Sequence, residues 1–342
     1  LNRWDLSGIV VTKTEDADLT KRLLPNIKTV IGSHPIPDER SVLATDKIIE
    51  TAKTVVEEDL VLCLISGGGS SLVTKPAEGI TLDEIQNLTS QLLNCGASIQ
   101  EINTLRKHLE IIKGGGLITL LYPARVIALI LSDVIGDDLS MIASGPTVPD
   151  TTTFKDALEI MGKYHLDNSQ NKKIISHFKS GSKGVIPETL KENDPRFQKV
   201  QNVIVGNNYL AALAGKKKAE QLGFYCQLIP EQFIGDSVEV AEKIVRIIHD
   251  FNSNPYAKKP CCLIAGGEAT VKVKGSGKGG RNQEVALRCA MEIEGLDNVC
   301  IATLATDGED GPTDAAGAIV TGKSIAEARN KGIDPKLYLE NN

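Results

Sequence analysis

The sequence predicts an α/β protein whose larger part is a Rossmann-like, doubly wound parallel sheet followed by a smaller α/β domain. Two observations lead to this fold class. Short apolar runs alternate along the chain with amphipathic stretches of helical periodicity. One apolar run, at 124–134, is nearly continuous, which is expected for a strand of a parallel sheet covered on both faces.

Strands and helices alternate through the first 252 residues. The helix expected at 81–93 has the clearest start, because Thr81 can cap it and Glu84 follows three residues later. The other expected strands are 8–13, 60–65, 202–206 and 224–229, and the other expected helices are 41–58, 207–222 and 237–251. We therefore predict a Rossmann-like domain over 1–252.

A short polar segment at 251–260, rich in Asn, Pro and Lys, resembles a linker. After it, the apolar runs 261–267 and 269–275 flank a short turn and predict an antiparallel pair of strands. A helix, a strand and a closing helix are expected over 282–293, 299–306 and 322–332. The second domain is therefore predicted over 253–342, with a mixed sheet.

Composition excludes several classes of protein. The net charge is −6, so the chain offers no general attraction for nucleic acid or for an anionic membrane. No apolar run approaches the roughly 20 residues that span a bilayer. The seven cysteines are scattered, without metal-ligand spacing, and are expected to be reduced thiols in a reducing compartment.

The stretch Ser66–Ser71, SGGGSS, directly follows the predicted strand 60–65. Ligands of open parallel sheets bind beyond the carboxyl ends of the strands, and glycines let backbone N–H groups point at one anion. The stretch is not a Walker A loop, because GxxxxGK[ST] is absent. A tight turn after a strand explains the glycines equally well, so the motif alone decides nothing.

Further glycine and aspartate motifs occupy similar positions. The loop after 124–131 carries Asp133, Asp137 and Asp138, the loop 275–284 carries Lys278 and Arg281, and the loop after 299–306 carries Asp307, Asp310 and Asp314. The last loop is not an EF-hand, because it lacks a flanking helix pair and a glutamate at its twelfth position. Glycine loops, fixed cations and carboxylates together suggest phosphate and Mg²⁺ chemistry.

Two more residues are candidates for substrate binding. Arg106 lies with Lys107 and His108 on a predicted helix, where it is either part of an exposed basic face or a clamp for a carboxylate. His34 lies in a loop made rigid by prolines, where a histidine is more often structural than catalytic. Both alternatives stay open at this point.

Longer motifs make the chain recognisable. They are HPIPDE (34–39), LISGGGSSL (64–72), EINTLRKHLEIIKGGGL (101–117), LSDVIGDDLSMIASGPTVPDTTTF (131–154), GGEATVKVKGSGKGGRNQE (266–284) and ATDGEDGPTDAAGAIV (305–320). In content and order they resemble the glycerate 2-kinases of the two-domain family that ends in a MOFRL domain. The similarity covers nearly all of the chain.

The resemblance implies an ATP- and Mg²⁺-dependent kinase that converts glycerate to 2-phosphoglycerate. Backbone N–H groups of Ser66, Gly67, Gly68, Gly69, Ser70 and Ser71, and of Gly279 and Gly280, are expected to hold phosphate or substrate oxygens. Arg106 and His34 are the expected glycerate ligands. Arg281, aided by Lys278, is expected to face the transferred phosphate, Asp307 and Asp310 to bind Mg²⁺, and Asp133 to act as base or second metal contact.

The chain also departs from the family pattern at both ends. It starts after the family's Gly-Lys-Ala motif and stops before the closing Thr-Gly-Pro-Thr-Gly-Thr-Asn loop. The first strand and helix of the Rossmann-like domain and the end of the MOFRL-like domain are therefore expected to be missing, and the 342-residue chain by itself is expected to be inactive. The expected compartment is the cytoplasm, or the mitochondrion if a targeting peptide precedes Leu1.

Two other functions stay open. One is a catalytically inactive family member that binds a nucleotide or a metabolite. The other is an NAD(P)H-dependent hydroxypyruvate reductase, although no GxGxxG fingerprint opens the first strand–helix unit. The expected partner is the small molecule glycerate, not nucleic acid or membrane, and a homodimer is one open alternative.

Overall fold

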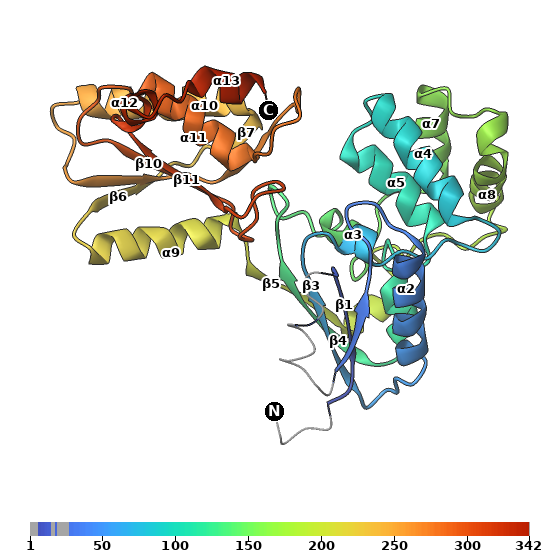
Figure 1. The fold of residues 1–342 in the computed structure, drawn as a ribbon. Coiled ribbons are helices and arrows are strands. Elements are labelled where there is room, and N and C mark those ends of the chain that lie inside the picture. Colours follow the sequence, from blue (N-terminus) through green and yellow to red (C-terminus); the bar gives the residue numbers. More distant parts are fainter. Residues whose placement is uncertain (1–5, 15–17, 19–26, 342) are drawn as a thin grey trace. The chain divides into compact units, whose positions relative to one another are not determined.

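The structure, a computed structural model, describes residues 6–14, 18 and 27–341. The chain divides into two compact units, Leu1–Asn207 and Asn208–Asn342. Both units combine helices with parallel strands (Figure 1). The predicted α/β class, with a Rossmann-like parallel sheet first, is confirmed.

The first unit is built on parallel strands. A three-stranded sheet has β4 at its centre, between β3 and β5. A second parallel pair joins β1 to β2. Their bounds are β1 Ile9–Thr12, β2 Lys28–Ile31, β3 Leu60–Ile65, β4 Arg125–Leu131 and β5 Val200–Gly206.

Four helices of the first unit gather in one cluster, drawn cyan and green in Figure 1. They are α4 Leu82–Asn94, α5 Ile99–Leu109, α7 Phe154–Lys163 and α8 Lys172–Ser182. Their shared core includes Ile85, Leu105 and Phe178, all almost fully buried. Thr81 and Ser98 begin α4 and α5 with capping boxes, as predicted for Thr81.

The remaining elements of the first unit lie close to the sheet or link the cluster to it. Near the sheet are α2 Glu39–Ala52, α3 Gly69–Leu72 and α6 Gly116–Leu121, and the 3₁₀ turns are η1 Ile142–Ser144, η2 Ser169–Asn171 and η3 Pro195–Lys199. Asp38 caps α2 by accepting a hydrogen bond from the N–H of Arg40. The short α3 directly follows β3, which places it at the carboxyl end of the sheet.

The prediction that both faces of this sheet are covered is wrong. Burial alternates along β3, and its outer residues Leu60, Leu62 and Leu64 are 53–75% exposed, as is Val205 of β5 at 55%. The apolar run of β4 is continuous in sequence, yet its most buried residues are Val126, Ala128 and Ile130, which share one face. Continuous apolar sequence therefore does not establish two covered faces here.

The second unit places helices on both sides of its strands (Figure 1). The strands are β6 Tyr225–Leu228, β7 Phe233–Asp236, β8 Cys261–Ile264, β9 Gly267–Thr270, β10 Cys300–Leu304 and β11 Gly317–Thr321. The helices are α9 Asn208–Gln221, α10 Ser237–Ser253, α11 Arg281–Glu292, α12 Ser324–Asn330 and α13 Pro335–Glu340. Its core packs Val240, Val285, Cys289 and Ile301 together from α10, α11 and β10.

The predicted antiparallel pair at 261–275 is wrong. β8 pairs with β6 and β9 pairs with β7, both in parallel, and the antiparallel pair is β10 with β11. Ala265 and Gly266 therefore form a bend between β8 and β9, which starts at Gly267, and not a hairpin turn. A Cβ atom on Gly267 would lie 2.1 Å from the carbonyl oxygen of Phe233, so the close approach of β7 and β9 needs glycine there.

The division between the units also differs from the predicted boundary at 252/253. Residues 208–252 belong to the second compact unit. The reason is strand pairing, because β6 and β7 find their partners in β8 and β9, and α10 packs against α11.

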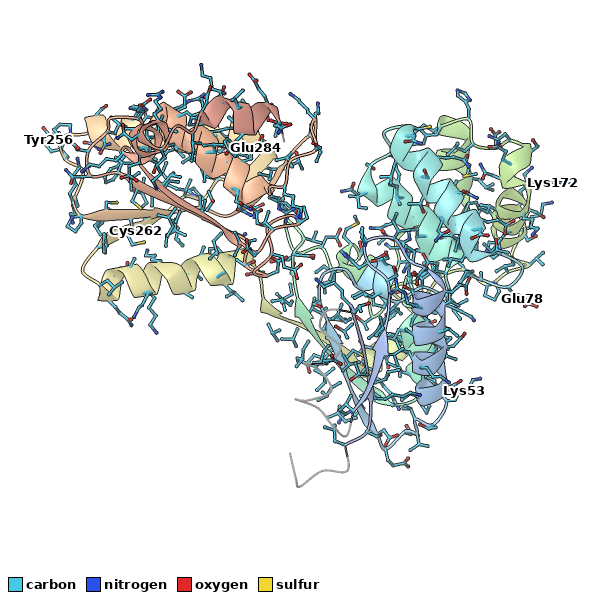
Figure 2. All side chains as sticks on the ribbon, viewed as in Figure 1. Lys53, Glu78, Lys172, Tyr256, Cys262 and Glu284 are labelled. Atoms are coloured by element: carbon cyan, nitrogen blue, oxygen red, sulfur yellow. The ribbon has the colours of Figure 1, made fainter. Side chains whose placement is uncertain are left out.

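Charged side chains lie mostly at the surface of each unit. Figure 2 shows Lys53 beyond the end of α2 and Lys172 at the start of α8, both pointing outward. Among the described helices, none combines the length and apolar character needed to cross a bilayer. A few charged groups are buried: Lys113 and Glu110 lie behind the loop 66–71, Asp310 lies beside the loop before α11, and Lys107 pairs with Asp150 away from both loops.

Candidate active site

The first glycine loop, Ser66–Ser71, follows β3 and includes the first three residues of α3, which begins at Gly69. Gly68 has φ 76°, a conformation that favours glycine, and it precedes the first residue of α3. In the part of the chain that the structure describes, the backbone N–H groups of Gly67 and Gly68 have no backbone acceptor. The loop therefore presents donors at the carboxyl end of the parallel sheet, as the sequence predicted.

Two predicted site residues lie against this loop. A Cβ atom on Gly67 would be 2.1 Å from Oδ2 of Asp133, which follows β4. A Cβ atom on Gly68 would be 2.8 Å from Cδ2 of His34, which lies between β2 and α2. Both side chains are exposed. The structure thus brings together the loop, a carboxylate and an imidazole from three separate segments.

Arg106 also reaches the loop, from α5, but not as a free clamp. Its Nη2 donates to the carbonyl oxygen of Ser70 at 2.8 Å, and its Nε donates to Oε1 of Glu110 at 2.9 Å. Only 14% of the side chain is exposed. The remaining nitrogen of the guanidinium, Nη1, has no hydrogen bond to a described residue. The contact of Arg106 with a substrate carboxylate stays a prediction, and Nη1 is the atom that could make it.

Lys113 is a residue of this region that the sequence did not single out. Its Nζ donates to the carbonyl oxygens of Ser70 at 2.7 Å and Val73 at 3.1 Å, and it forms an ion pair with Oε2 of Glu110 at 3.0 Å. Burial lowers the pKa of Lys113 to about 8, and the nearby Arg106 acts in the same direction, although Glu110 opposes both. The one signal in the sequence was a lysine directly before three glycines.

The hydroxyl of Ser70 is held from another segment. It lies 2.7 Å from the hydroxyl of Ser144, which itself donates to Oδ1 of Asn103 at 2.9 Å. Because the Ser144 hydrogen is used on Asn103, Ser70 is the donor to Ser144. Ser144 has φ 59° and is fully buried, within the motif 131–154.

The second glycine loop, before α11, has a different arrangement. Oδ1 of Asp310 accepts from the N–H of Asn282 at 2.9 Å, and Oδ2 accepts from the N–H of Gln283 at 2.8 Å. The side-chain amides of the same two residues add hydrogen bonds at 3.1 Å each. Burial would raise the pKa of Asp310, but these hydrogen bonds outweigh it and lower the pKa. Asp310 therefore caps α11 as a buried carboxylate.

This geometry limits what the start of α11 can bind and bears on one predicted role, that of Asp310. The N–H groups of Asn282 and Gln283 are unavailable to a phosphate while Asp310 occupies them. Asp310 is 1% exposed with both oxygens engaged, so its role as an Mg²⁺ ligand finds no support in this arrangement. Gly280 is required here, because a Cβ atom would lie 2.2 Å from Cγ of Asp310.

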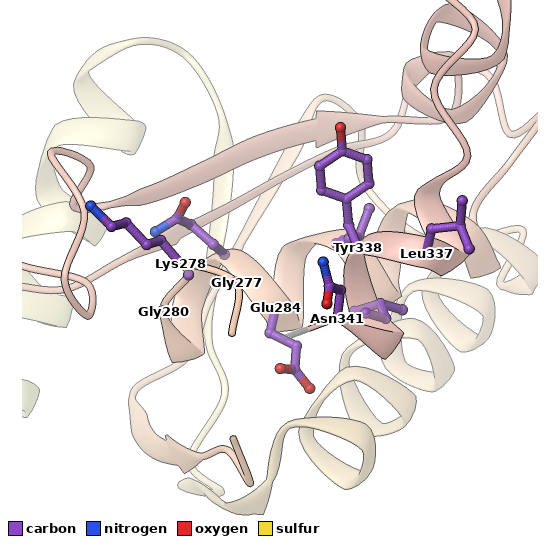
Figure 3. A pocket seen from close by; sticks show the side chains of 11 residues that line it. Gly277, Lys278, Gly280, Glu284, Leu337, Tyr338 and Asn341 are labelled. Atoms are coloured by element: carbon purple, nitrogen blue, oxygen red, sulfur yellow. The ribbon is translucent and has the colours of Figure 1, made fainter. Parts of the chain in front are cut away.

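The two predicted cations of the second unit, Lys278 and Arg281, are exposed, whereas Gly280 is buried. Arg281 is the first residue of α11, and its Nη1 pairs with Oε1 of Glu268 at 3.0 Å. Lys278, Gly279 and Gly280 line a cavity of about 540 Å³ beside α13, shown in Figure 3 with Glu284 and Tyr338. Glu284 accepts from Ser237 and Arg288, so its charge is balanced within the unit.

Asp307 is an exposed carboxylate in the loop after β10, where its Oδ1 accepts from the N–H of Glu309 at 3.2 Å. Among the residues that the structure describes, no three His, Cys, Asp or Glu side chains are grouped to hold a metal ion. Mg²⁺ commonly uses only one or two carboxylates together with waters and substrate phosphates. Asp133 in the first unit and Asp307 in the second are each an exposed carboxylate that could serve as such a Mg²⁺ ligand.

Comparison with known protein families gives two matches. Residues 1–179 match the family described as Domain of unknown function (DUF4147), and residues 261–342 match the MOFRL family. The chain is 42% identical to a D-glycerate 2-kinase of Thermotoga maritima over 337 residues, which cover 98% of this chain and 77% of that protein. A glycerate 2-kinase of Pyrococcus horikoshii is 40% identical, over 97% of this chain and 74% of that protein.

Solved structures agree with these matches. The crystal structure of a Thermotoga maritima glycerate kinase superposes with a TM-score of 0.83 at 41% identity, covering 98% of this chain and 78% of that one. A Pyrococcus horikoshii protein superposes with a TM-score of 0.80 at 36% identity, covering 99% of this chain and 81% of that one.

Proposed function

Because this chain belongs to the glycerate kinase family, we propose that it transfers the γ-phosphoryl group of ATP to the 2-hydroxyl of glycerate. The observation that carries this proposal is the identity of 40% or more over nearly the full chain to two glycerate 2-kinases. The products are 2-phosphoglycerate and ADP. The name of the Thermotoga relative specifies the D enantiomer, and we propose the same substrate here.

The arrangement in the first unit supports a site for phosphate or substrate oxygens at Ser66–Ser71. Gly67 and Gly68 leave no side chain between the backbone donors and a bound anion, and Asp133 and His34 lie beside them. An oxygen of the substrate held there would be close to a carboxylate that can accept its proton. We assign Asp133 as the base and His34 and Nη1 of Arg106 as the groups that bind glycerate.

In the second unit, we assign Arg281 and Lys278 to the transferred phosphate. Both are exposed cations next to Gly279 and Gly280. A planar guanidinium can bind two phosphate oxygens at once, and such a charge is most valuable where negative charge is shared over the transferring group. Mg²⁺, held by Asp307 and phosphate oxygens, would neutralise part of the same charge.

The chemistry balances without an additional reactant. The 2-hydroxyl oxygen forms a bond to the γ-phosphorus, and the bond from that phosphorus to the bridging oxygen of ADP breaks. The hydroxyl proton passes to the carboxylate of Asp133, and the electron pair of the broken bond leaves with ADP. The residues named therefore have to position groups and balance charge, which is what phosphoryl transfer requires.

The test uses the purified full-length protein with ATP, Mg²⁺ and each enantiomer of glycerate. ³¹P NMR of the product distinguishes 2-phosphoglycerate from the 3-phospho isomer, and we expect the 2-phospho signal. A parallel assay with NAD(P)H and hydroxypyruvate tests the reductase alternative. Nucleotide binding without turnover would instead identify a catalytically inactive member, and reduction of hydroxypyruvate without kinase activity would replace the proposal.

A further inference from the structure

The charged cluster behind the first glycine loop is almost completely buried, as is the pair of Lys107 with Asp150 in the same unit. Side-chain exposure is 1% for Lys113, 0% for Glu110 and 14% for Arg106. Elsewhere in the same unit, lysines such as Lys53 and Lys172 point into solvent (Figure 2). Removing an ion from water is costly unless partners replace the water, so each contact of this cluster has to be accounted for.

The contacts converge on the carboxyl end of α3. Lys113 donates to the carbonyl oxygens of Ser70 and Val73, and Arg106 donates to the same Ser70 oxygen. Glu110 lies between the two cations, with Oε1 2.9 Å from Nε of Arg106 and Oε2 3.0 Å from Nζ of Lys113. Two positive charges are therefore aimed at one short helix end and are held there by one carboxylate.

A helix as short as α3 needs such support. It spans four residues, Gly69–Leu72, which is too short to be stable by its own hydrogen bonds. The last carbonyl groups of a helix have no partner within it, and positive charge near them is favourable. The cluster satisfies those carbonyl oxygens with charged donors, so it fixes where α3 ends and how it is oriented.

The orientation of α3 in turn determines the loop before it. α3 starts at Gly69, so any tilt moves Gly67 and Gly68, which lie against Asp133 and His34. We propose that Lys113, with Glu110, is a positioning residue that holds the loop Ser66–Ser71 in its ligand-binding form before the ligand arrives. The expected effect of Lys113 on turnover rests on the proposed function, whereas its expected effect on the conformation of the loop does not.

The experiment compares three variants of the full-length protein. Lys113→Met removes the charge and keeps much of the volume, Lys113→Arg keeps a cation with several donors, and Lys75→Met is the matched control. Lys75 lies three residues after the end of α3, but its side chain, which is 30% exposed, pairs with Asp46 and not with the carbonyl groups of α3. We measure amide hydrogen exchange of the segment 66–75 together with kcat and KM for ATP and glycerate.

We expect exchange in 66–75 to be at least tenfold faster in Lys113→Met and unchanged in Lys75→Met. We also expect a decrease in kcat of about 100-fold, since a displacement of about 1 Å in a reacting group can have that effect. Lys113→Arg should recover kcat to within about tenfold of wild type, because the charge-assisted donors are restored. A merely destabilised protein would keep kcat per folded molecule.

The outcomes separate this inference from the proposed function. Wild-type protein that does not phosphorylate glycerate would overturn the proposed function, and the exchange measurement would still test the loop. Unchanged exchange in Lys113→Met would overturn the positioning role whatever the activity. If Lys113→Met does not fold, Glu110→Gln is measured in its place, and normal exchange with normal kcat in that variant would equally overturn the inference.

Discussion

The two glycine loops of this protein are similar in sequence and opposite in their electrostatics. The loop Ser66–Ser71 is held from behind by two cations, Arg106 and Lys113, and its glycine N–H groups face no backbone acceptor among the described residues. The loop before α11 is held by a carboxylate, because Asp310 already occupies the donors at the helix start. The first loop therefore leaves glycine N–H donors open, whereas at the second loop a carboxylate of the protein itself already occupies two backbone donors.

This difference divides the proposed work between the loops. In the proposed function an anion uses the backbone of the first loop directly, whereas at the second loop the N–H groups of Asn282 and Gln283 are occupied by Asp310 and we assign the side chains of Arg281 and Lys278 to the anion. Glycine-rich sequence before a helix is thus insufficient to identify a phosphate site. What matters is whether the protein has already supplied an acceptor.

The largest expected effect comes from Arg281. If side chains and not backbone groups bind the phosphate at the second loop, Arg281→Ala should lower kcat by about 10³-fold, as removal of a phosphate-facing arginine does. Stability should change little, because Arg281 is 45% exposed and has a single surface ion pair with Glu268. Steady-state kinetics with thermal unfolding measures both quantities.

Glu268→Gln is the matched control, since it removes the partner and keeps the arginine. It should retain kcat within about threefold, the size expected for a surface ion pair. Near-normal turnover in Arg281→Ala would mean that the second loop does not serve the phosphate.

The second prediction separates the two aspartates of the acidic loop. Asp310→Ala removes four hydrogen bonds to a buried carboxylate and leaves the start of α11 uncapped. It should lower the free energy of unfolding by about 3 kcal/mol. Asp307→Asn should leave stability within about 0.5 kcal/mol, because Asp307 is exposed, and should raise the Mg²⁺ concentration needed for half-maximal rate.

Chemical denaturation and a Mg²⁺ titration of the kinase rate measure these effects. Equal destabilisation by both substitutions would contradict the assignment of Asp310 as the cap. An unchanged Mg²⁺ titration in Asp307→Asn would move the proposed metal contact to Asp133.

The fold class, the order of most elements and the placement of Ser66–Ser71 and Asp133 at the ends of neighbouring strands could be predicted from the sequence, whereas the approach of His34 could not, because the strand before it (β2) was not predicted. The reason is that parallel strands place the loops after them at one edge. Motifs of 6–24 letters also resembled a known family across the chain. In these regions the alternation of apolar and amphipathic stretches and the family motifs pointed to the same fold.

Three features could not be predicted, each for a physical reason. The Gly-Gly pair at 266–267 has the letters of a turn, and only the pairing of Gly267 with β7 shows that a strand starts there. Lys113 looks like a surface lysine until its partners, 40 and 43 residues away, are known. Asp310 and the N–H groups that it caps at the start of α11 are 27 and 28 residues apart in sequence, and their pairing depends on tertiary structure.

The third prediction tests whether the first loop needs bare backbone. A Cβ atom on Gly67 would lie 2.1 Å from Oδ2 of Asp133, so Gly67→Ala has to displace the side chain assigned as base. We expect kcat/KM to fall about 30-fold, an intermediate loss for a displaced catalytic group. Gly162→Ala is the control, because it lies in α7 with no atom within 4 Å of the added Cβ, and it should stabilise the fold by up to about 1 kcal/mol. Wild-type kinetics in Gly67→Ala would place the reacting groups elsewhere.

The smallest effect concerns the pH response of the cation behind the first loop. Lys113 has a pKa of about 8 in the folded protein, mainly because of burial, against 10.5 for an ordinary lysine. Between these two values the unfolded chain binds more protons than the folded one, so the contribution of Lys113 to stability rises with pH. Below about pH 8 both states are protonated and the contribution is constant.

Wild type should therefore gain about 1 kcal/mol relative to Lys113→Met between pH 7 and pH 9, since one pKa unit corresponds to about 1.4 kcal/mol. Arg106 and Glu110 are the charged groups that face Lys113, and both are present in the two proteins, so the difference isolates the lysine. Denaturant unfolding at both pH values measures this difference in the free energy of unfolding.

The carboxylate cap responds in the acidic range. The pKa of Asp310 is lowered in the folded protein, so the contribution of Asp310 to stability is complete above the unfolded value of 3.8 and is lost as the pH falls below it. If the difference in the free energy of unfolding between wild type and Lys113→Met stayed constant from pH 7 to 9, Lys113 would keep its charge over that range. The two loops would then still be held by buried charges of opposite sign, but neither charge would respond to alkaline pH.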